Sequence, residues 1–399
     1  MSLWSAIFAI DVLLWFIMAA SVFYVFLFSL ASLLPRRRVS QPSPINSQRF
    51  LVLFPAYHED AVIVNSVGTF LKQDYPTELY HITVISDHMS EETNKRLSAL
   101  PITLLQPTFE KSSKAKALQY AIQQTLDFRH QIYDYVIILD ADNIVEADFL
   151  SKLSQVANPR EAIQCHRTAK NADNDIAALD GISEEINNSI FRRGHNRIGM
   201  SSALIGSGMC FDYEWFKSNV SHLDSAVEDR ELEALLLRQR IFIRYAEDIL
   251  VMDEKVSSSD NFQRQRLRWM TGQVQTLFRM LPFLPKALIT FNLDYIDKTI
   301  QQALIPRSIL LALTPVLTIL AFVGGQFSVL SSQFSVIKWL CLLIALVLAI
   351  YVAIPAPLRT KALFCKGLAL PRLVGRMLYN ILHIRTQNKE FIHTSHHHN

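Results

Sequence analysis

Three long apolar segments constrain the fold of this chain more than any other feature of its sequence. The first spans residues 3–34 and contains a single charge, Asp11; the other two span residues 309–323 and 336–354 and are separated by a short uncharged loop. About 20 apolar residues in a helix cross the roughly 30 Å hydrocarbon core of a bilayer. Buried core helices are the alternative, but the length of the segments and their lack of charge disfavour it. The sequence therefore predicts three transmembrane helices.

Few polar residues interrupt these segments. Pro315 in the second is compatible with a membrane helix, and Lys338 lies early enough in the third for its ammonium group to reach the headgroups. Asp11 is the only acidic residue in the three segments, and we expect it to have no charged partner. A transporter would need paired charges within its spans, so this pattern argues against one.

Basic residues predict how the chain is oriented. Arg36–Arg38 follow the first span, no basic residue lies between the second and third, and a further set follows the third: Arg359, Lys361, Lys366, Arg372 and Arg376. Lys and Arg collect on the cytoplasmic side of membranes. We therefore expect an integral protein of the cell (inner or cytoplasmic) membrane whose amino terminus is outside and whose catalytic domain is cytoplasmic. Because nothing basic precedes the first span, it does not resemble a cleaved signal peptide.

Charge and cysteine content exclude other classes of protein. The net charge of +3 is small for 399 residues, which argues against a nucleic-acid binder, whereas basic residues beside the spans suit anionic membrane lipids. The four cysteines show no metal-ligand spacing: Cys165, Cys210, Cys341 and Cys365. On a cytoplasmic face we expect them to be reduced.

Between the spans, residues 50–260 alternate short β-rich runs with helical stretches, a pattern typical of an α/β domain with a mainly parallel sheet. The first predicted strand, residues 50–54, ends in Pro55-Ala-Tyr57-His-Glu59-Asp60, not in the glycine-rich turn of dinucleotide-binding proteins. A second strand, residues 81–87, ends in Asp87, whose carboxylate can accept hydrogen bonds from a nucleobase. Carboxyl ends of adjacent parallel strands converge on one ligand-binding edge.

Two further groups predict binding of a metal and of phosphate. Asp140 and Asp142 follow the apolar run 135–139, and carboxylates in this position can hold Mg²⁺ or Mn²⁺ against a diphosphate. Three lysines follow a predicted strand at 102–105 and open a helix that runs through residues 117–126: Lys111, Lys114 and Lys116. Ammonium groups at a helix start attract phosphate, although a solvated basic turn is the alternative.

Taken together, the motifs resemble one enzyme family. They are Pro55-Ala-Tyr-His-Glu59, Asp87, Lys116, Asp140-Ala-Asp142, Glu228-Asp229 and Gln265-x-x-Arg268-Trp269. Their order and spacing over residues 50–275 are similar to those of membrane-integral family-2 inverting glycosyltransferases. That family includes cellulose, chitin, hyaluronan and poly-N-acetylglucosamine synthases and ceramide glucosyltransferase. A D-x-D alone is a weak signal, but together with the acid pair and Q-x-x-R-W it is specific.

The resemblance implies a GT-A fold, a nucleoside-diphosphate sugar donor and a role for each donor-side residue. Tyr57, Glu59 and Asp87 would contact the nucleoside, and Lys116 would contact the base or the phosphates. Asp140 would contact the sugar and, with Asp142, hold the metal ion, Mg²⁺ or Mn²⁺.

The resemblance also implies the catalytic residues. Asp229 would be the general base beside Glu228, because inverting transfer needs a carboxylate to take the proton of the acceptor hydroxyl. Val227 stands where the family usually has threonine, which leaves the acid pair intact. The alternative is an acid pair on a helix surface.

The Q-x-x-R-W residues would close the site: Gln265, Arg268 and Trp269. Arg268 can neutralise the departing diphosphate, and Trp269 offers an apolar face to the acceptor sugar. The alternative is an Arg and a Trp that anchor the protein to headgroups. Residues 203–209, which contain Gly206 and Gly208, resemble the glycine-rich loop on the acceptor side of the family's site.

These features predict the following organisation. We expect a transmembrane helix at 1–35, a linker at 36–49, the glycosyltransferase domain at 50–275, interfacial amphipathic helices at 276–305, transmembrane helices at 306–326 and 335–356, and a cytoplasmic tail at 357–399 with a further candidate interfacial helix.

The predicted activity is that of a metal-dependent hexosyltransferase, with a UDP-sugar favoured as donor. It would extend a cell-surface polysaccharide or lipid-linked glycan, and three spans are few for a polymer channel, so self-association or an export partner would assist. A single-sugar glycolipid synthase similar to ceramide glucosyltransferase is the second reading. A non-catalytic sugar-nucleotide-binding subunit is a third, although such a protein would be expected to have lost a metal carboxylate or the base.

Overall fold

The computed structural model describes residues 3–36, 47–127, 133–170, 175–225, 227–255, 259–326 and 333–359. These residues form two compact units. The helical unit contains residues 3–35, 185–198, 300–326 and 333–359. The sheet unit contains the remaining described residues.

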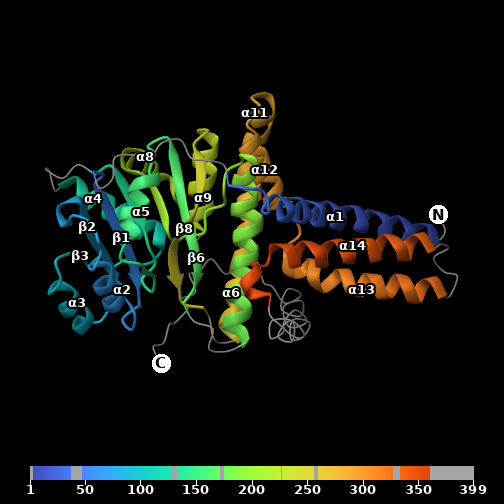
Figure 1. Cartoon of the computed structure of the whole chain (residues 1–399), viewed down its shortest axis with the longest axis horizontal. Coiled ribbons are helices and arrows are strands. Elements are labelled where there is room, and N and C mark those ends of the chain that lie inside the picture. The colour runs from blue at the N-terminus through green and yellow to red at the C-terminus, as the bar shows by residue number, and fades with distance from the viewer. Residues whose placement is uncertain are drawn as a thin grey trace. The chain divides into compact units, whose positions relative to one another are not determined.

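A single eight-stranded sheet forms the centre of the sheet unit, in the order β3-β2-β1-β4-β7-β6-β8-β5 (Figure 1). The strands are β1 (Phe50–Tyr57), β2 (Tyr80–Asp87), β3 (Thr103–Leu105), β4 (Tyr135–Ile138), β5 (Ile144–Val145), β6 (Glu161–Ala169), β7 (Met209–Asp212) and β8 (Phe242–Asp253). Strands β3, β2, β1 and β4 are parallel to one another, as the sequence predicts. The other half of the sheet is mixed, because β7 lies antiparallel between β4 and β6.

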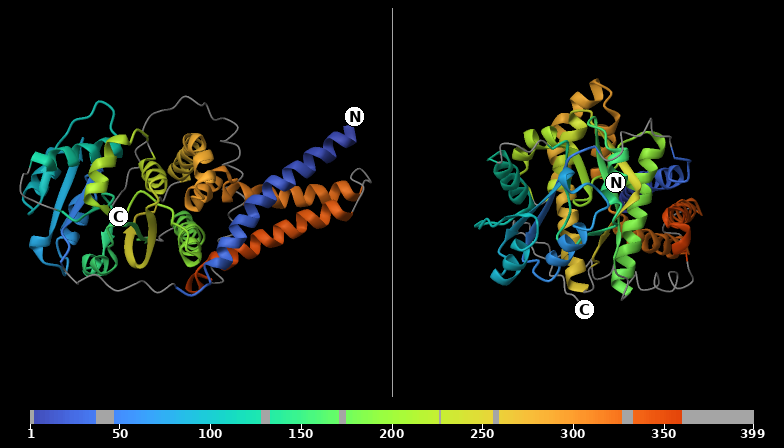
Figure 2. Two further views of the ribbon diagram at one scale, coloured as in Figure 1. Left: turned by 90° about the horizontal axis from the view of Figure 1, so that it is seen from above. Right: turned by 60° about the vertical axis from the view of Figure 1, so that its left-hand side comes forward.

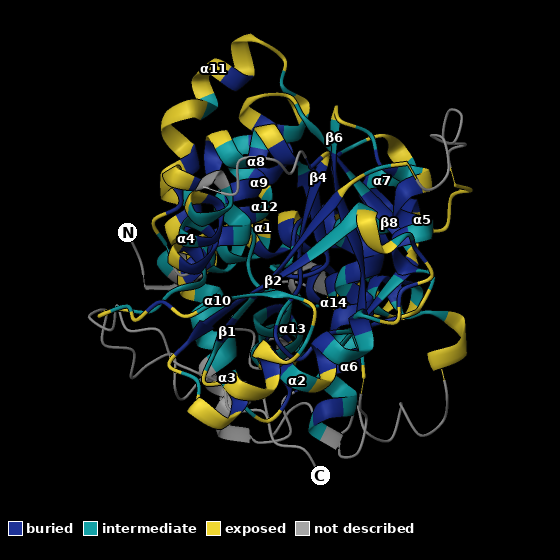
Figure 3. Cartoon of the chain, turned by 90° about the vertical axis from the view of Figure 1, so that its left-hand side faces the viewer, coloured by how far each residue is buried: buried dark blue, intermediate teal, exposed yellow. Residues whose placement is uncertain are grey.

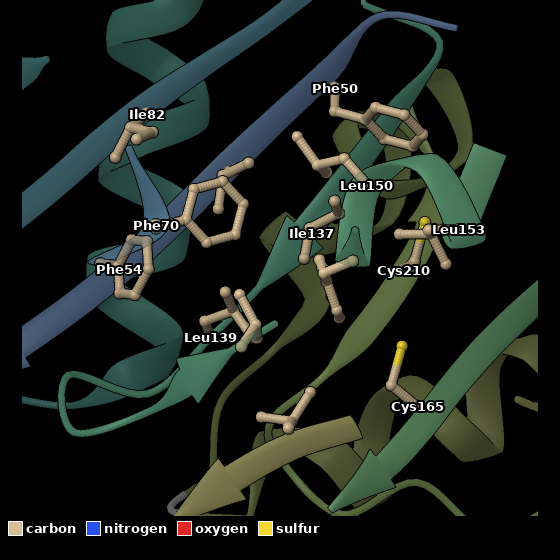
Figure 4. Close-up of a cluster of buried hydrophobic side chains, with 14 of the residues drawn as sticks. Phe50, Phe54, Phe70, Ile82, Ile137, Leu139, Leu150, Leu153, Cys165 and Cys210 are labelled. Atoms are coloured by element: carbon tan, nitrogen blue, oxygen red, sulfur yellow. The ribbon is translucent and has the colours of Figure 1, made fainter. Parts of the chain in front are cut away.

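Side chains of β1 alternate between two hydrophobic cores, one on each face of the sheet. Phe50, Val52 and Phe54 enter the core that contains Phe70 of α2 and Leu150 of α5 (Figure 4). The intervening Leu51 and Leu53 enter a second core, formed with residues of α4, α8 and α9. Since both faces are covered, the strand reads as a continuous apolar run instead of an alternating one.

Ten helices of the described chain lie wholly or mainly in the sheet unit. They are α2 (Ile63–Phe70), α3 (Glu91–Ser98), α4 (Lys114–Asp127), α5 (Phe149–Val156), α6 (Asp175–Asn187), α8 (Tyr213–Asn219), α9 (Glu228–Arg238), α10 (Ser259–Met280), α11 (Leu284–Ile289) and α12 (Leu293–Ala303). Helix α4 begins at Lys114, one of the three lysines that the sequence places at the start of this helix. Burial increases from the helix surfaces towards the strands (Figure 3).

The helical unit contains three helices that are long and apolar enough to cross a membrane: α1 (Leu3–Ala31), α13 (Arg307–Gln326) and α14 (Gln333–Ala353). Helix α14 packs beside both α1 and α13, as the views in Figures 1 and 2 agree. Met18 of α1, Leu310 of α13 and Trp339 of α14 lie in one buried cluster.

Asp11 is not isolated, which corrects the expectation from the sequence. The ammonium group of Lys338 forms an ion pair with its carboxylate, and the indole nitrogen of Trp339 donates a second hydrogen bond to it at 2.8 Å. The indole of Trp15 in turn donates to the Lys338 carbonyl at 3.1 Å. The partners are 327 residues apart, and only the packing of α1 on α14 brings them together. A lack of paired charges therefore no longer argues against a transporter.

Candidate active site

The parallel half of the sheet brings the predicted donor-side residues to one edge. Tyr57 and Asp87 are direct partners in the register of β1 and β2, and each is the last residue of its strand. Leu53 pairs with Ile138, so Asp140 and Asp142 follow β4 at the level where β1 ends. Carboxyl ends of parallel strands form the usual ligand-binding edge of such sheets.

Three aromatic rings form a cluster at the ends of β1 and β2. The ring of Tyr57 lies 4.5 Å from that of His58 and 5.7 Å from that of His88, measured between centroids. Nδ1 of His88 is 2.6 Å from a carboxylate oxygen of the buried Asp87. Both histidines have positive φ, 54° and 56°, which is uncommon for residues other than glycine and often marks functional sites. Sequence reasoning assigned a role to neither histidine, although His58 lies within the Pro55–Glu59 motif; the signal for both was their position directly after a strand.

Backbone and side-chain hydrogen bonds fix the turn that carries the two aspartates. The Asp140 amide donates to Oδ1 of Asn143 at 3.0 Å and to Oγ of Ser207 at 3.1 Å. Asp142 accepts from Nδ2 of Asn143 at 3.1 Å and from the Glu254 amide at 3.0 Å. Asp142 is 4% exposed, whereas the Asp140 side chain is 32% exposed. The Asp142 carboxylate is thus held by two hydrogen bonds, and the Asp140 side chain is the more exposed of the two.

Several acidic side chains lie close together around this turn, and they raise one another's pKa values. Burial and the neighbouring Asp142 and Asp140 raise the pKa of Glu59 to about 9. Burial, Asp253 and Asp140 likewise raise the pKa of Asp142 well above its usual value. A divalent cation would relieve this repulsion, because it stabilises the ionised carboxylates.

The residues fit a shared metal site. No group of three or more His, Cys, Asp or Glu side chains in the described residues could enclose a metal ion. Asp140 and Asp142 offer two oxygen donors, and Mg²⁺ is commonly held by one or two carboxylates together with substrate phosphates. The carboxylate turn therefore suits a cation that arrives with a diphosphate.

Lys114, not Lys116, reaches the carboxylates. Its ammonium group forms an ion pair with Asp140, lies 3.5 Å from Glu228 and donates to the Gly206 carbonyl at 2.6 Å. Burial alone would lower the pKa of Lys114, but Asp140 and Glu228 raise it, so the amine is charged. Lys116 is exposed, and its ammonium group donates to the Lys111 carbonyl at 2.7 Å. The signal for Lys114 was its place as the first residue of α4.

The acid pair begins helix α9 and faces the glycine-rich loop. Gly206 has φ +81°, and a Cβ added there would lie 3.7 Å from a carboxylate oxygen of Asp229. Burial raises the pKa of Glu228 to about 7, with Lys114 opposing the shift and Asp229 adding to it. Glu228 is buried and Asp229 half-buried, so the pair is not simply a solvated helix surface. The positive φ of Gly206 favours glycine at this point of the loop.

Helix α10 carries the Q-x-x-R-W residues and packs next to the acid pair. A Cβ added at Gly272 would lie 2.6 Å from Cγ1 of Val227, the residue that precedes Glu228. The guanidinium of Arg266 lies 4.9 Å from the ring centroid of Trp269. Oε1 of Gln265 is buried and has no hydrogen-bond partner among the described residues. Helix α10 therefore lies against the start of α9 through Gly272, while the Lys116 ammonium group is bonded within its own loop.

A solved structure shares this fold. A mannosyltransferase from Pyrobaculum calidifontis, solved with GDP-mannose and Mn²⁺, aligns with a TM-score of 0.54 at 17% identity, covering 88% of this chain and 99% of its own. The GT-A fold predicted from the sequence, with one amino-terminal and two later apolar helices, is confirmed.

Two other solved structures match more weakly. TarS from Staphylococcus aureus aligns with a TM-score of 0.43 at 13% identity over 83% of this chain and 91% of its own. Glucosyl-3-phosphoglycerate synthase from Mycobacterium tuberculosis aligns with a TM-score of 0.38 at 14% identity over 54% and 74%.

Sequence comparison gives the family. No curated protein sequence matches the chain. A family model described as "Glycosyltransferase like family 2" matches residues 47–272, more than half of the chain, and this range contains the carboxylate turn, the acid pair and the Q-x-x-R-W residues. The chain belongs to the family 2-like glycosyltransferases.

Proposed function

We propose that this protein is a metal-dependent, inverting hexosyltransferase that acts at a membrane surface. One observation carries the proposal: the Lys114 ammonium group contacts both Asp140 of the carboxylate turn and Glu228 of the acid pair. Donor-side and acceptor-side residues therefore belong to a single charged cluster. A binding module that had lost catalysis would not need to keep both sides.

On the donor side, Tyr57 and Asp87 would bind the nucleoside, with Glu59 beside them, and Lys114 would bind the diphosphate. A UDP-sugar is the favoured donor. Asp140 and Asp142 would hold Mg²⁺ or Mn²⁺, which supplies positive charge to the leaving diphosphate. Glu59, protonated in the absence of a cation, can donate a hydrogen bond through its neutral carboxyl group.

On the acceptor side, Asp229 would act as general base. Its carboxylate takes the proton from the acceptor hydroxyl as that oxygen attacks the anomeric carbon. The bond from this carbon to the diphosphate oxygen breaks, and the electron pair leaves with the nucleoside diphosphate. Attack opposite the leaving group inverts the anomeric configuration. Arg268 would neutralise the leaving charge, and Trp269, with Gln265 nearby, would hold the acceptor sugar.

Exposed apolar side chains support contact with lipid in addition to the three long helices. From the last turn of α10 to the first residue of α12, the exposed fractions reach 79% at Ile289 and 80% at Phe291, with Phe278 and Leu293 also exposed. Most of α11 is exposed in Figure 3. Such a surface suits the interface plane of a bilayer. We propose that α11 and its flanks bind membrane lipids on the cytoplasmic face, with the amino terminus outside.

The acceptor would be a growing surface glycan or a lipid. Polymer synthesis with three spans would require self-association or an export partner, whereas addition of one sugar to a membrane lipid would require neither. Both readings use the same site residues and differ only in how often the product rebinds.

Product analysis tests the proposal. Detergent-purified protein would be incubated with Mn²⁺, a panel of nucleoside-diphosphate sugars and a membrane lipid extract, and the products would be examined by mass spectrometry. A ladder of sugar additions identifies a polymerase, and a single addition to lipid identifies a glycolipid synthase. Donor binding without transfer or hydrolysis, with every donor and extract, would refute the enzyme and favour the non-catalytic subunit.

A further inference from the structure

Helix α6 carries two carboxylates, one turn apart, that bind opposite sides of the candidate site. Asp180 accepts from the guanidinium of Arg266 at 2.6 Å, and Arg266 stacks on Trp269 in α10. Glu184 accepts from Nε of Arg167 at 3.0 Å and forms an ion pair with Lys255. None of the contacts of α6 was foreseen from the sequence.

The contacts of Glu184 lead to the metal carboxylate. Lys255 lies 2.8 Å from Asp253 at the end of β8, and Asp253 accepts from Nδ2 of Asn143 at 3.2 Å. The same amide nitrogen donates to Asp142 at 3.1 Å. A continuous set of hydrogen bonds and ion pairs therefore joins Glu184 to Asp142.

These charges are buried, and each has a partner of opposite sign. Side-chain exposure is 2% for Lys255, 6% for Glu184 and 14% for Asp253. Arg167 completes the cluster as a second cation, 3.7 Å from Asp253. Burying four charges costs desolvation free energy that their attraction often does not exceed, so stability alone gives little reason for such a cluster. A requirement for fixed geometry gives a better one.

We infer that Asp180 and Glu184 are positioning residues that align the two halves of the site through one helix. Glu184 holds Asp142 for the metal ion, through Lys255, Asp253 and Asn143. Asp180 holds Arg266, and through it the ring of Trp269, for the acceptor. The inference deepens the proposed function and rests on it for the roles of Asp142 and Trp269.

Two single substitutions separate the two roles. With Glu184→Gln we expect Mn²⁺ affinity in the presence of nucleoside diphosphate, measured by EPR without turnover, to fall about 10- to 100-fold, as for other residues that orient metal ligands. With Asp180→Asn we expect Mn²⁺ affinity to change less than twofold. We expect its ratio of sugar transfer to donor hydrolysis to fall instead, and Asp180→Glu to restore part of that ratio.

Glu161→Gln is the matched control. Glu161 of β6 pairs with Arg244 of β8 at 2.6 Å, and these two strands also carry Arg167 and Asp253. The Glu161 side chain is 18% exposed, so this ion pair is also largely buried. This variant should leave both measurements unchanged. Equal effects of all three substitutions, or an unchanged Mn²⁺ affinity in folded Glu184→Gln, would overturn the inference.

A variant that fails to fold and a protein that lacks transferase activity can each be distinguished from failure of the inference. If Glu184→Gln fails to fold, the variant Glu184→Gln/Lys255→Met removes one charge of each sign, and it should fold and still bind Mn²⁺ weakly. Wild-type affinity in this double variant would overturn the role of Glu184. If the wild-type protein binds Mn²⁺ and nucleotide but transfers nothing, the proposed function fails, while the EPR comparison still tests whether Glu184 positions Asp142.

Discussion

Glu228 and Asp229 are neighbours in sequence but have different surroundings. Glu228 is buried against Lys114, while Asp229 is half-buried beside Gly206. The first acid thus has a lysine as its charge partner, and the second is the more exposed of the two. This difference supports Asp229 as the proton acceptor in the proposed reaction.

Replacing Asp229 by Asn should remove turnover and spare donor binding. Loss of a general base typically costs about 10²- to 10⁴-fold in rate. Initial rates and nucleotide affinity by calorimetry measure the two effects separately. Glu214→Gln, at an exposed carboxylate on α8, is the control and should behave like the wild type. Full activity in Asp229→Asn would remove this residue from the mechanism.

The two lysines of α4 allow a paired test of the phosphate site. Lys114→Met should weaken binding of the nucleoside diphosphate about 10- to 100-fold, the range expected for loss of a hydrogen bond to a charged group. Lys116→Met should change it less than twofold, because the Lys116 ammonium group binds the Lys111 carbonyl. Calorimetry with Mn²⁺ present measures the nucleoside-diphosphate affinity of the two variants. The reverse order would support the assignment made from the sequence.

Glu59 should make the metal-free protein sensitive to pH. Its pKa is raised from 4.5 to about 9, so the protonated form is favoured in the folded state. The stability that the protonated Glu59 side chain contributes to the folded state is fully present below about pH 4.5 and is lost as the pH rises through 9. Glu59→Gln should therefore flatten the fall in Tm between pH 5 and 9 and raise Tm at pH 8.5 by several degrees. Identical pH profiles in EDTA would contradict the assignment.

At the scale of elements, helix α10 depends on a close approach to the start of α9. A Cβ at Gly272 would press against Cγ1 of Val227, so Gly272→Ala should shift α10 relative to the acid pair. We expect Mn²⁺-dependent donor binding to be unchanged and transfer to fall, with a stability cost of about 1–3 kcal/mol.

A second substitution checks this explanation. Val227→Ala removes the methyl groups that the Cβ introduced by Gly272→Ala would meet, and the double variant should regain most of the stability and transfer lost in the single variant. Thermal unfolding and product formation provide the readouts. No recovery in the double variant would show that the defect arises elsewhere on α10.

At the scale of the whole molecule, the prediction concerns sidedness. A membrane-impermeant maleimide should label Glu214→Cys, in a background that carries both Cys341→Ser and Cys365→Ser, in inside-out vesicles and not in right-side-out vesicles. Cys165 and Cys210 are buried and should stay unlabelled, so the unsubstituted Glu214 in the same background is the control. Labelling of Glu214→Cys in right-side-out vesicles would place the sheet unit outside the cell.

Much of the fold could be predicted because the necessary signals are local. Long, nearly uncharged apolar runs predicted α1, α13 and α14, and the runs that end in Asp87 and before Asp140 predicted β2 and β4. The direction of β7 could not be predicted, because hydrophobic pattern does not encode whether neighbouring strands are parallel. The partner of Asp11 was missed for a similar reason: pairing across 327 residues depends on helix packing.

For the candidate site, the sequence by itself determined which chemical groups are available: the carboxylates after β4, the acid pair, the lysines of α4 and the Q-x-x-R-W residues. Only the tertiary structure decided which of them meet. It selected Lys114 over Lys116 for the carboxylate cluster, and it tied Asp142 and Trp269 to α6 through Glu184 and Asp180. The physical reason is that residue type fixes charge and hydrogen-bonding capacity, whereas distance and burial determine how strongly charges act on each other.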